Sequence, residues 1–373
     1  KYRLFLIMIN SLGFDKKTAD TKIIVAMSGG VDSSVAAVKL KKEGYDVTGV
    51  TLRLYSQANV QKSKTCCAGQ DIEDASMVAK QFDFNHYVSD YQDKFFNGVI
   101  DKFVDSYSKG MTPIPCINCN QTVKFTDLLN EAKNQNADAL VTGHYVRRIC
   151  ENDSISLHKA KDLSKDQSYF LFATTKEQLE YLRFPIGEYL KSEIRQMARD
   201  FSLNVKDKPD SQDICFVTTG SYRTLVEKLK PETIKEGKII DTNNKIIGKH
   251  KGIANYTIGQ RKGLGVSGSK EALYVIDIKP KDNLIILGEK KFLKKTSIYL
   301  NSLNWLDHNL GNNFRCSARI RSTQMEMEGQ IQIKDNIAKF TFDNSVDSTS
   351  PGQACVFYKK DKVLGGGWIS KTS

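Results

Sequence analysis

The feature that most constrains the fold of this chain is a Gly-rich loop that joins an apolar strand to a helix. The strand pattern of residues 22–28 runs through Ser28-Gly29-Gly30-Val31-Asp32-Ser33 directly into a helical pattern. Gly29 and Gly30 have no Cβ, so the backbone can take unusual dihedral angles and point its N–H groups at an anion bound at the helix N-terminus. The neighbouring serine hydroxyls add donors, and Asp32 could cap the helix or help to hold Mg²⁺. The loop therefore predicts a pyrophosphate site, with a Gly-Gly turn that binds nothing as the alternative.

The first half of the chain alternates strands and helices. Strand patterns fall at residues 22–28, 46–54, 85–88 and 137–142, and helical patterns fall between them at 32–43, 72–82, 93–106 and 120–134. This alternation predicts a doubly wound α/β domain with a parallel sheet, in which ligands bind beyond the carboxyl ends of the strands. The Gly-rich loop follows the first strand at such an end, and Gly143 follows the fourth.

The pattern changes after residue 218, where Gly-rich turns and short alternating segments replace the long helices. Alternation of apolar and polar residues is clearest at 330–333, 338–342 and 354–358. A period of two indicates antiparallel strands, so we expect a C-terminal antiparallel β-barrel with a small mixed domain before it. A length of 373 residues suits two or three domains. We place an N-terminal extension at 1–20, the nucleotide-binding and catalytic domain at 21–218, the central domain at 219–288 and the barrel at 289–373.

The charge balance points to an anionic partner. Lys and Arg number 55 against 43 Asp and Glu, which gives a formal net charge of +12. An excess of this size without an extended basic block suits a folded protein that docks a polyanion, and a generally basic proteome is the alternative reading. Residues 1–9 mimic a short signal peptide, but no small-residue cleavage site follows and the apolar run is too short to span a membrane. We therefore expect a cytoplasmic protein that does not interact with a membrane.

Two of the eight cysteines, Cys119 and Cys215, lie in segments that suit a catalytic thiol. Cys119 follows a loop stiffened by Pro113 and Pro115, and we expect it at the start of a helix, where the helix dipole and the nearby Lys124 would stabilise a thiolate. Cys215 lies in a polar loop that enters an apolar pair. Either thiol alone would more often be buried and inert. Next to a pyrophosphate loop, both become candidate catalytic residues.

Several motifs occur together over nearly the whole chain. They lie at residues 26–34, 119–120 with 124–125, 142–145, 165–171, 210–211 with 214–216, 259–265 and 350–353. With these motifs the chain resembles the bacterial tRNA-specific 2-thiouridylases, a family of PP-loop ATP pyrophosphatases that replace the C2 oxygen of the wobble uridine with sulfur. The resemblance implies an adenine nucleotide alpha hydrolase-like first domain and a tRNA-binding barrel. It also implies ATP with Mg²⁺ as cofactor and the anticodon arm of tRNA as partner.

The resemblance assigns roles to the motifs. Cys215 would carry a persulfide received from a cysteine desulfurase or a sulfur-relay protein, and Cys119 would be the nucleophile that forms a transient disulfide with it. Adenylation turns the uridine C2 oxygen into a leaving group, so that the products are 2-thiouridine, AMP and pyrophosphate. The residues implied in ATP binding are Ala26, Met27, Ser28, Gly29, Gly30, Val31, Asp32, Ser33, Leu52 and Gly143.

The tRNA contacts implied by the resemblance are His144, Lys165, Asp166, Gln167, Arg319, Ile320 and Gln353. Arg319 and Arg321 alternate along a predicted barrel strand and would face the phosphates together. The target base would be flipped out of its stack into the catalytic pocket. Other readings remain for two of these segments, because His144 would serve equally as a satisfied loop histidine and residues 165–167 as a solvated helix N-terminus.

One departure from the family pattern raises a metal alternative. Many members have Asn-Pro-Asp ahead of the catalytic loop, whereas this chain has Ile114-Pro115-Cys116. Cys116, Cys119 and Cys215 could then hold a [4Fe–4S] cluster, as related thiolases do, and Cys66 with Cys67 could form a further redox pair. The persulfide route explains Cys119 and Cys215 without a metal. Two other functions stay open: another PP-loop ATP pyrophosphatase of the lysidine synthase or amidotransferase type, and a non-catalytic RNA-binding protein.

Overall fold

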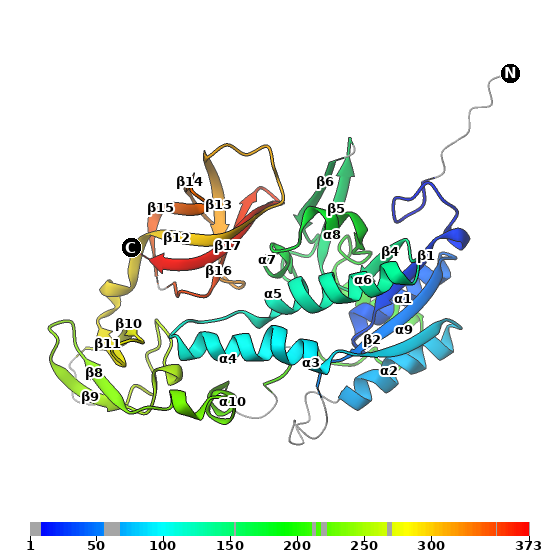
Figure 1. The fold of residues 1–373 in the computed structure, drawn as a ribbon. Helices are drawn as coiled ribbons and strands as arrows, with labels where there is room; N and C mark the ends of the chain where they lie inside the picture. The colour runs from blue at the N-terminus through cyan, green and yellow to red at the C-terminus, as the bar shows by residue number, and fades with distance from the viewer. Residues whose placement is uncertain are drawn as a thin grey trace. The chain divides into compact units, whose positions relative to one another are not determined.

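The computed structural model describes residues 9–55, 68–152, 154–210, 214–217, 222–266, 271–347 and 349–372 (Figure 1). The chain forms two compact units. The first consists of Lys1–Phe96 and Cys119–Thr218, and the second of Asn97–Asn118 and Thr219–Ser373. The segment Asn97–Asn118, which we expected in the nucleotide-binding domain, therefore clusters with the C-terminal part of the chain.

A five-stranded parallel sheet forms the centre of the first unit. Its order is β3-β2-β1-β4-β7, from β1 (Lys22–Ala26), β2 (Asp46–Arg53), β3 (Asn85–Asp90), β4 (Ala139–Thr142) and β7 (Leu182–Arg183). The chain runs outward from β1 through β2 to β3 and then returns to the other side of β1 with β4. The strand order thus reverses between β1 and β4, which is where open α/β sheets bind their ligands. The predicted parallel α/β fold is confirmed.

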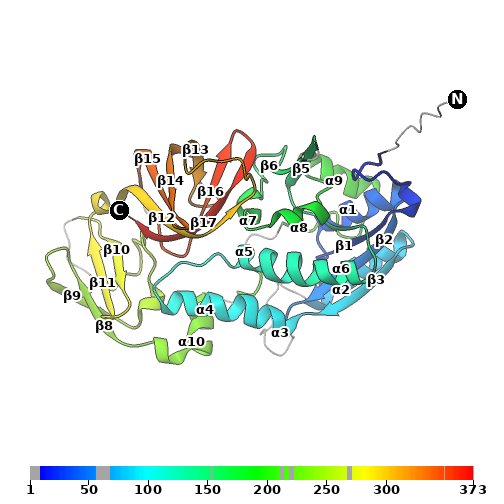
Figure 2. The same cartoon turned by 45° about the horizontal axis from the view of Figure 1, so that its top comes forward.

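Helices α1 (Val31–Lys42), α2 (Ala68–Gln81) and α9 (Lys191–Asp200) contribute to one apolar core with the sheet. Successive residues of a strand face opposite sides, so Ile23 and Val25 of β1 join this core. Small residues make the packing of α1 close, because Ala36 and Ala37 are fully buried. Figure 2 shows α1 and α9 lying together, in agreement with their contact. This packing fixes the first turn of α1, which follows the Gly-rich loop.

The helix that carries Cys119 differs from its prediction. It begins at Pro115 and not at residue 120, with α5 (Pro115–Cys119) followed by a π-helical segment η3 (Asn120–Leu128) and by α6 (Leu129–Asn134). Proline is favoured in the first turn, where its missing N–H has no partner to lose. Cys119 therefore lies at the end of the first turns and not at the helix N-terminus. The predicted helix at 93–106 is likewise interrupted, as α3 (Gln92–Phe95), the π segment η2 (Phe96–Ile100) and α4 (Asp101–Ser108).

Shorter elements complete the first unit. A polar hairpin that the sequence patterns did not reveal is formed by β5 (Val146–Glu151) and β6 (Ser154–Lys159), which pair antiparallel. The remaining elements are η1 (Thr18–Asp20), α7 (Ser168–Leu171) and α8 (Lys176–Tyr181). The hairpin was missed because its exposed and half-buried residues do not alternate cleanly.

The second unit contains a small four-stranded sheet. Its order is β10-β11-β8-β9, from β8 (Gly237–Ile240), β9 (Ile246–His250), β10 (Tyr274–Lys279) and β11 (Leu284–Gly288). Helix α4 packs against α10 (Tyr222–Leu229), where the rings of Tyr107 and Tyr222 stack at 4.1 Å and Lys230 pairs with Asp105 at 3.0 Å. Three short 3₁₀ turns, η4 (Pro231–Thr233), η5 (Ile253–Asn255) and η6 (Lys290–Leu293), connect these elements and the barrel.

The predicted C-terminal barrel is confirmed. Six antiparallel strands form it: β12 (Lys294–Trp305), β13 (Asn313–Arg319), β14 (Met327–Lys334), β15 (Ile337–Asp347), β16 (Ala354–Lys359) and β17 (Lys362–Thr372). Pairing of β12 with both β15 and β17 closes the barrel and leaves no open edge among these strands. Aromatic rings fill the interior, with Trp305 stacked on Phe357 at 5.7 Å. In the described part of the chain, no helix is both long and apolar enough to cross a bilayer.

Candidate active site

The Gly-rich loop turns sharply between β1 and α1, and its geometry requires glycine at residue 29. Gly29 has a φ of +70°, and a Cβ there would lie 2.3 Å from the backbone oxygen of Asp71 in α2. Gly30 takes an extended conformation as the N-cap of α1. The Ser28 N–H donates to Ser33 Oγ at 3.1 Å, which folds the loop over the first helical turn. Such a turn directs backbone N–H groups outward and suits an anion.

The remaining residues of this predicted ATP site line the same edge of the sheet. Ala26 ends β1, and the buried Met27 and Val31 belong to the apolar core, so their contribution to a ligand would come from the backbone. Leu52 lies near the end of β2, two residues after Val50, whose carbonyl oxygen accepts a hydrogen bond from the Met27 N–H. A Cβ on Gly143 would lie 2.7 Å from the backbone nitrogen of Ser33. The loop after β4 therefore packs directly on the Gly-rich loop, at the switch point of the sheet.

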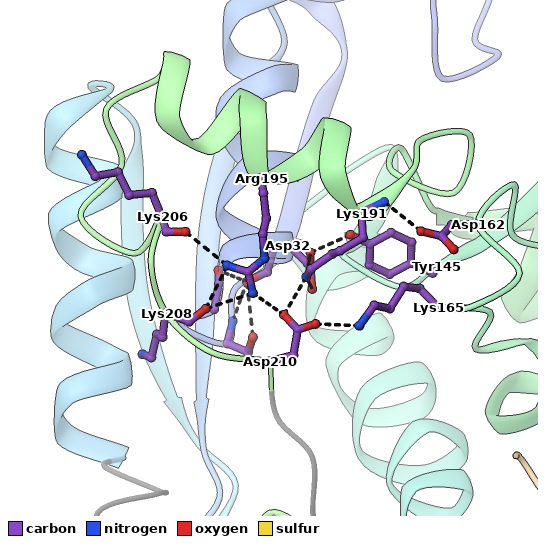
Figure 3. A network of polar contacts seen from close by, with 12 residues as sticks. Asp32, Tyr145, Asp162, Lys165, Lys191, Arg195, Lys206, Lys208 and Asp210 are labelled. Carbon is purple, nitrogen blue, oxygen red and sulfur yellow. Dashed lines mark hydrogen bonds and ion pairs between the residues drawn. The ribbon is translucent and has the colours of Figure 1, made fainter.

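A network of ion pairs extends from Asp32 in the first turn of α1 (Figure 3). Lys191, the first residue of α9, donates to both Asp32 carboxylate oxygens at 2.6 and 2.7 Å, and the Tyr145 hydroxyl donates to one of them at 2.8 Å. The Lys191 side chain is only 10 % exposed. Burial and the charge of Asp32 raise the pKa of Tyr145. Asp32 is thus held by one buried cation and one neutral hydroxyl.

Asp210 is the second carboxylate of this network. It pairs with Lys191 at 3.0 Å, with Arg195 at 2.7 Å and with Lys165 at 2.9 Å. Burial alone would raise the pKa of Asp210, but hydrogen bonds and charges from Lys165 and Lys191 lower it to about 2. We call Asp32, Tyr145, Lys165, Lys191, Arg195 and Asp210 the Asp32–Asp210 network. It holds three cations against two carboxylates beside an anion-binding turn.

A further lysine fastens the loop from its other side. Lys208 Nζ donates to the Gly29 carbonyl oxygen at 2.9 Å, to Asp71 at 2.6 Å and to Asp74 at 2.7 Å. Burial alone would lower the pKa of Lys208, but the two carboxylates raise it. The lysine therefore ties α2 to the carbonyl that precedes the N-cap of α1. It thereby holds Gly29 in its positive-φ conformation.

Sequence patterns did not identify Lys191, Arg195, Lys208 or Tyr145 as site residues. Lys191 and Arg195 are four positions apart on α9 and so project from one face of it. The spacing of four could have marked Lys191 and Arg195 as a pair in the sequence. It could not have linked them to Asp32, because Lys191 lies 159 residues from Asp32 along the chain. Only the packing of α9 against α1 brings them together.

Both candidate cysteines belong to the first unit, and their settings differ. Cys119 is buried at the junction of α5 with the π segment η3, and Asn120 beside it donates to the Phe170 carbonyl oxygen at 3.2 Å. Single π segments in helices are frequent at functional sites. Cys215 is exposed, while its neighbour Phe216 is buried with its ring edge-on to Phe95 at 5.8 Å. The buried ring anchors the segment that carries the exposed Cys215.

The structure adds no support for the metal alternative. Among the residues that the structure describes, which include Cys116, Cys119 and Cys215, no group of three or more His, Cys, Asp or Glu side chains could hold a metal ion. Cys116 is exposed in α5. Cys66, Cys67 and Ser211 lie outside the described residues.

All four predicted tRNA contacts in the first unit are engaged within the protein, Lys165 through its ion pair with Asp210. A hydrogen bond of 2.8 Å joins His144 Nδ1 to the Thr142 hydroxyl, and the His144 ring packs against Phe125 and Phe184. Burial, followed by the charge of Lys124, holds the pKa of His144 well below its usual value, so the ring is neutral. Asp166 accepts from the Ser168 N–H and hydroxyl, and Gln167 Oε1 accepts from the Tyr145 N–H at 2.9 Å.

The predicted contacts in the barrel are placed differently from one another. Arg319 ends β13 and pairs with Glu326 at 3.0 Å, whereas Arg321 lies beyond the strand, so the two do not alternate along it. Ile320 is fully buried in the barrel core, which leaves only its backbone for a ligand. The side-chain oxygen of Gln353 is buried and has no hydrogen-bond partner among the described residues.

Comparison with known proteins matches the chain along most of its length. Family profiles described as the tRNA methyl transferase HUP domain, the tRNA methyl transferase PRC-barrel domain and the aminomethyltransferase beta-barrel domain match residues 21–219, 224–289 and 295–369. The tRNA-specific 2-thiouridylase MnmA of Rhodospirillum centenum is 47 % identical over 97 % of this chain and 94 % of its own. The protein of the same name from Orientia tsutsugamushi is 51 % identical over 94 % of this chain and 95 % of its own.

Likeness to solved structures is weaker. A 4-thiouridine synthetase, solved as an RNA complex with bound ATP, is 19 % identical with a TM-score of 0.36, over 57 % of this chain and 50 % of that one. An NMN synthetase from Francisella tularensis gives a TM-score of 0.33 at 17 % identity, over 56 % of this chain and 77 % of that one. Scores this low carry no argument about function.

Proposed function

We propose, because this chain belongs to the family of tRNA-specific 2-thiouridylases, that it uses ATP to activate the C2 oxygen of a tRNA wobble uridine and replaces that oxygen with sulfur. The observation that carries the proposal is the pairing of the Gly-rich loop with the Asp32–Asp210 network at the switch point of the sheet. A turn of backbone N–H groups beside three cations suits a triphosphate.

The chemistry explains why a nucleotide is needed. The C2 carbonyl of uracil is a poor electrophile, and its oxygen is a poor leaving group. Attack of that oxygen on the α-phosphate of ATP forms the adenylate and expels pyrophosphate, after which AMP leaves in place of oxide. The loop 28–33 would hold the pyrophosphate, and the cations would neutralise the charge that develops on it.

Lys191 would be the main cation of this step. Its ammonium lies between the carboxylates of Asp32 and Asp210, at 2.6 and 3.0 Å. Phosphate oxygens are strong acceptors for lysine, so a bound triphosphate would exchange partners with these carboxylates. Lys165 and Arg195 would follow, because each is already paired with Asp210.

The residues of the site fit Mg²⁺ as the companion of ATP. Asp32 and Asp210 offer carboxylate oxygens, and Ser28 and Ser33 offer hydroxyl oxygens, which are the ligands that Mg²⁺ prefers. When bound, Mg²⁺ supplies positive charge to the phosphates. Release of the two carboxylates from Lys191 would make them available to hold it.

Sulfur transfer would use the two cysteines. Cys215 carries a persulfide, and its outer sulfur attacks C2 of the adenylated uridine while AMP leaves. The Cys119 thiolate then attacks the inner sulfur of Cys215, so that a disulfide forms, 2-thiouridine is released, and the proton of Cys119 passes to solvent. Release of the outer sulfur as hydrosulfide before it reaches C2 gives the same products. A dithiol reductant then reopens the disulfide.

The exposures of the two thiols support this division of labour. Cys215 is exposed, so a cysteine desulfurase or sulfur-relay protein could reach it to deliver the persulfide sulfur. Cys119 is buried, so it would be protected from other oxidants. The net charge of +12 suits the tRNA phosphates, and the anticodon base would be flipped out of its stack.

The test is nucleoside mass spectrometry of tRNA after incubation with ATP, Mg²⁺, a cysteine desulfurase and cysteine. We expect 2-thiouridine at the wobble position with the native chain and none with Cys215→Ser. Cys150→Ser is the matched control, because Cys150 is also exposed but lies in the β5–β6 hairpin. Normal thiolation by Cys215→Ser would contradict the persulfide assignment.

A further inference from the structure

The segment that leads from α4 into the Cys119 helix is held by a turn of the β-barrel. Residues 109–114 of the second unit lead from α4 to α5, whose last residue, Cys119, begins the next segment of the first unit. We propose that the barrel turn 349–353 is a positioning element for Cys119 in sulfur transfer, in addition to any contact that Gln353 makes with RNA. The proposal rests on the proposed function and assigns the barrel a second role in it.

Two hydrogen bonds join Thr112 to the turn. The Thr112 N–H donates to the Pro351 carbonyl oxygen at 2.8 Å, and the Thr112 hydroxyl lies 2.9 Å from the Ser350 hydroxyl. Ser350 is 1 % exposed and Thr112 is half-buried, so the hydroxyl contact is partly shielded from water. Both polar groups that Thr112 offers on this side, its amide and its hydroxyl, are therefore used on the barrel.

The shape of the turn is matched to the segment. Gly352 has a φ of +87°, and a Cβ there would lie 2.9 Å from Met111 Cβ and 3.2 Å from the Thr112 nitrogen. The turn itself is fastened to β17, because the Gly352 N–H donates to the Ile369 carbonyl oxygen at 2.9 Å and the Ile369 N–H returns a bond to Gln353 at 2.8 Å. Any larger residue at 352 would push residues 111 and 112 off a rigid support.

The segment is also held at its start. Gly110 has a φ of +68°, and a Cβ there would lie 2.8 Å from Ile278 at the end of β10 and 3.2 Å from Pro280. The Met111 N–H donates back to the Ser106 carbonyl oxygen at 3.0 Å, which closes the end of α4. The chain between α4 and α5 is thus fixed by the central sheet at one residue and by the barrel two residues later.

The anchoring of residues 109–114 should affect sulfur transfer by Cys119 more than adenylation at the Gly-rich loop. α5 begins three residues after Thr112, with Pro113 and Pro115 stiffening the connection. Attack by Cys119 requires its sulfur in line with the bond that breaks, between the inner and outer sulfurs of Cys215, and misplacement by about 1 Å costs such steps up to about a hundredfold. Adenylation uses the nucleotide loop and not Cys119. Loosening the turn should therefore slow sulfur transfer and leave adenylation in place.

The experiment follows the two steps separately in a single turnover. Pyrophosphate formation reports adenylation, 2-thiouridine reports sulfur transfer, and the Cys119–Cys215 disulfide is followed by mass spectrometry of alkylated peptides. The variants are Thr112→Val, which removes the hydroxyl and keeps the volume, Thr112→Ser, which keeps the hydroxyl, and Gly352→Ala. Gly311→Ala is the matched control, because nothing lies within 4 Å of the added Cβ in the barrel loop.

We expect Thr112→Val to slow 2-thiouridine and disulfide formation about fivefold, the usual effect of one hydrogen bond, and Gly352→Ala to slow them more. Pyrophosphate formation, the tRNA Kd and the melting temperature of Thr112→Val should stay near those of the native chain, and Thr112→Ser should restore the rate. Unchanged disulfide formation in Thr112→Val, or a loss confined to the tRNA Kd, would overturn the proposal. Absence of 2-thiouridine with the native chain would instead contradict the proposed function.

Discussion

Replacing Lys191 by methionine should show how much the Asp32–Asp210 network contributes to stability and how much it contributes to the rate of adenylation. Methionine keeps the length of the side chain but removes an ammonium that contacts Asp32 at 2.6 and 2.7 Å and Asp210 at 3.0 Å. Asp210 keeps Arg195 and Lys165 as partners, whereas Asp32 keeps the Tyr145 hydroxyl. The loss of stability therefore comes mainly from Asp32, which is left without a cation among the described residues.

The magnitude can be worked from burial and from the bonds lost. Removal of one partner of a fully buried pair costs about 3–5 kcal/mol. The Asp32 side chain is 31 % exposed, so water offsets part of this and we expect about 2 kcal/mol off the free energy of unfolding. A charge-assisted hydrogen bond to a developing phosphate charge is worth about 1.5–3 kcal/mol, so adenylation should slow by roughly ten- to a hundredfold.

The assay is the initial rate of pyrophosphate formation with tRNA, ATP and Mg²⁺, together with urea unfolding of the same preparations. Lys206→Met is the matched control, because Lys206 is exposed on the same segment as Lys208 and contributes only its carbonyl oxygen to Arg195. Adenylation by Lys191→Met within twofold of the native rate, with unfolding destabilised as expected, would refute the role of Lys191 in catalysis and leave it a structural one.

Three further results are expected. Gly29→Ala should abolish ATP binding and lower the free energy of unfolding by about 1–3 kcal/mol, because the φ of +70° at residue 29 and the nearby backbone of Asp71 exclude a Cβ. Isothermal titration with ATP measures the affinity, and a near-native affinity would contradict this prediction. Cys119→Ser should still form pyrophosphate while failing to form 2-thiouridine and the disulfide, so that thiolation at the native rate would exclude its role as nucleophile. Asp210 has its folded-state pKa lowered from 3.8 to about 2, so the stability it contributes is fully present above about pH 4 and is lost as the pH falls towards 2. Asp210→Asn should flatten acid unfolding in that window, and an unchanged acid transition would contradict the assignment.

The sequence was sufficient for the parts of the fold that local pattern determines. The parallel sheet followed from buried apolar strands alternating with helices, and the loop 28–33 followed from two glycines placed between a strand and a helix. The barrel followed from alternation of period two, which its closed antiparallel pairing preserves. These features depend on residues close together in the chain.

Features that depend on tertiary packing were missed. Lys191 and Lys208 reach the Gly-rich loop from a helix and a loop more than a hundred residues away, and no local pattern distinguishes them from the other lysines of the chain. The π segment after Cys119 has an ordinary helical composition, so only the backbone reveals it. The start of the same helix was detectable, because Pro115 is a typical first helical residue.

The central claim is that ATP activates the C2 oxygen of the wobble uridine, and an isotope experiment tests it most directly. A tRNA whose wobble uridine carries the heavy oxygen isotope at C2 is incubated with the native chain, ATP, Mg²⁺, a cysteine desulfurase and cysteine. Mass spectrometry should find the heavy oxygen in AMP, in step with the 2-thiouridine formed. Formation of 2-thiouridine with unlabelled AMP, or AMP formation without any thiolation of the wobble uridine, would contradict the account.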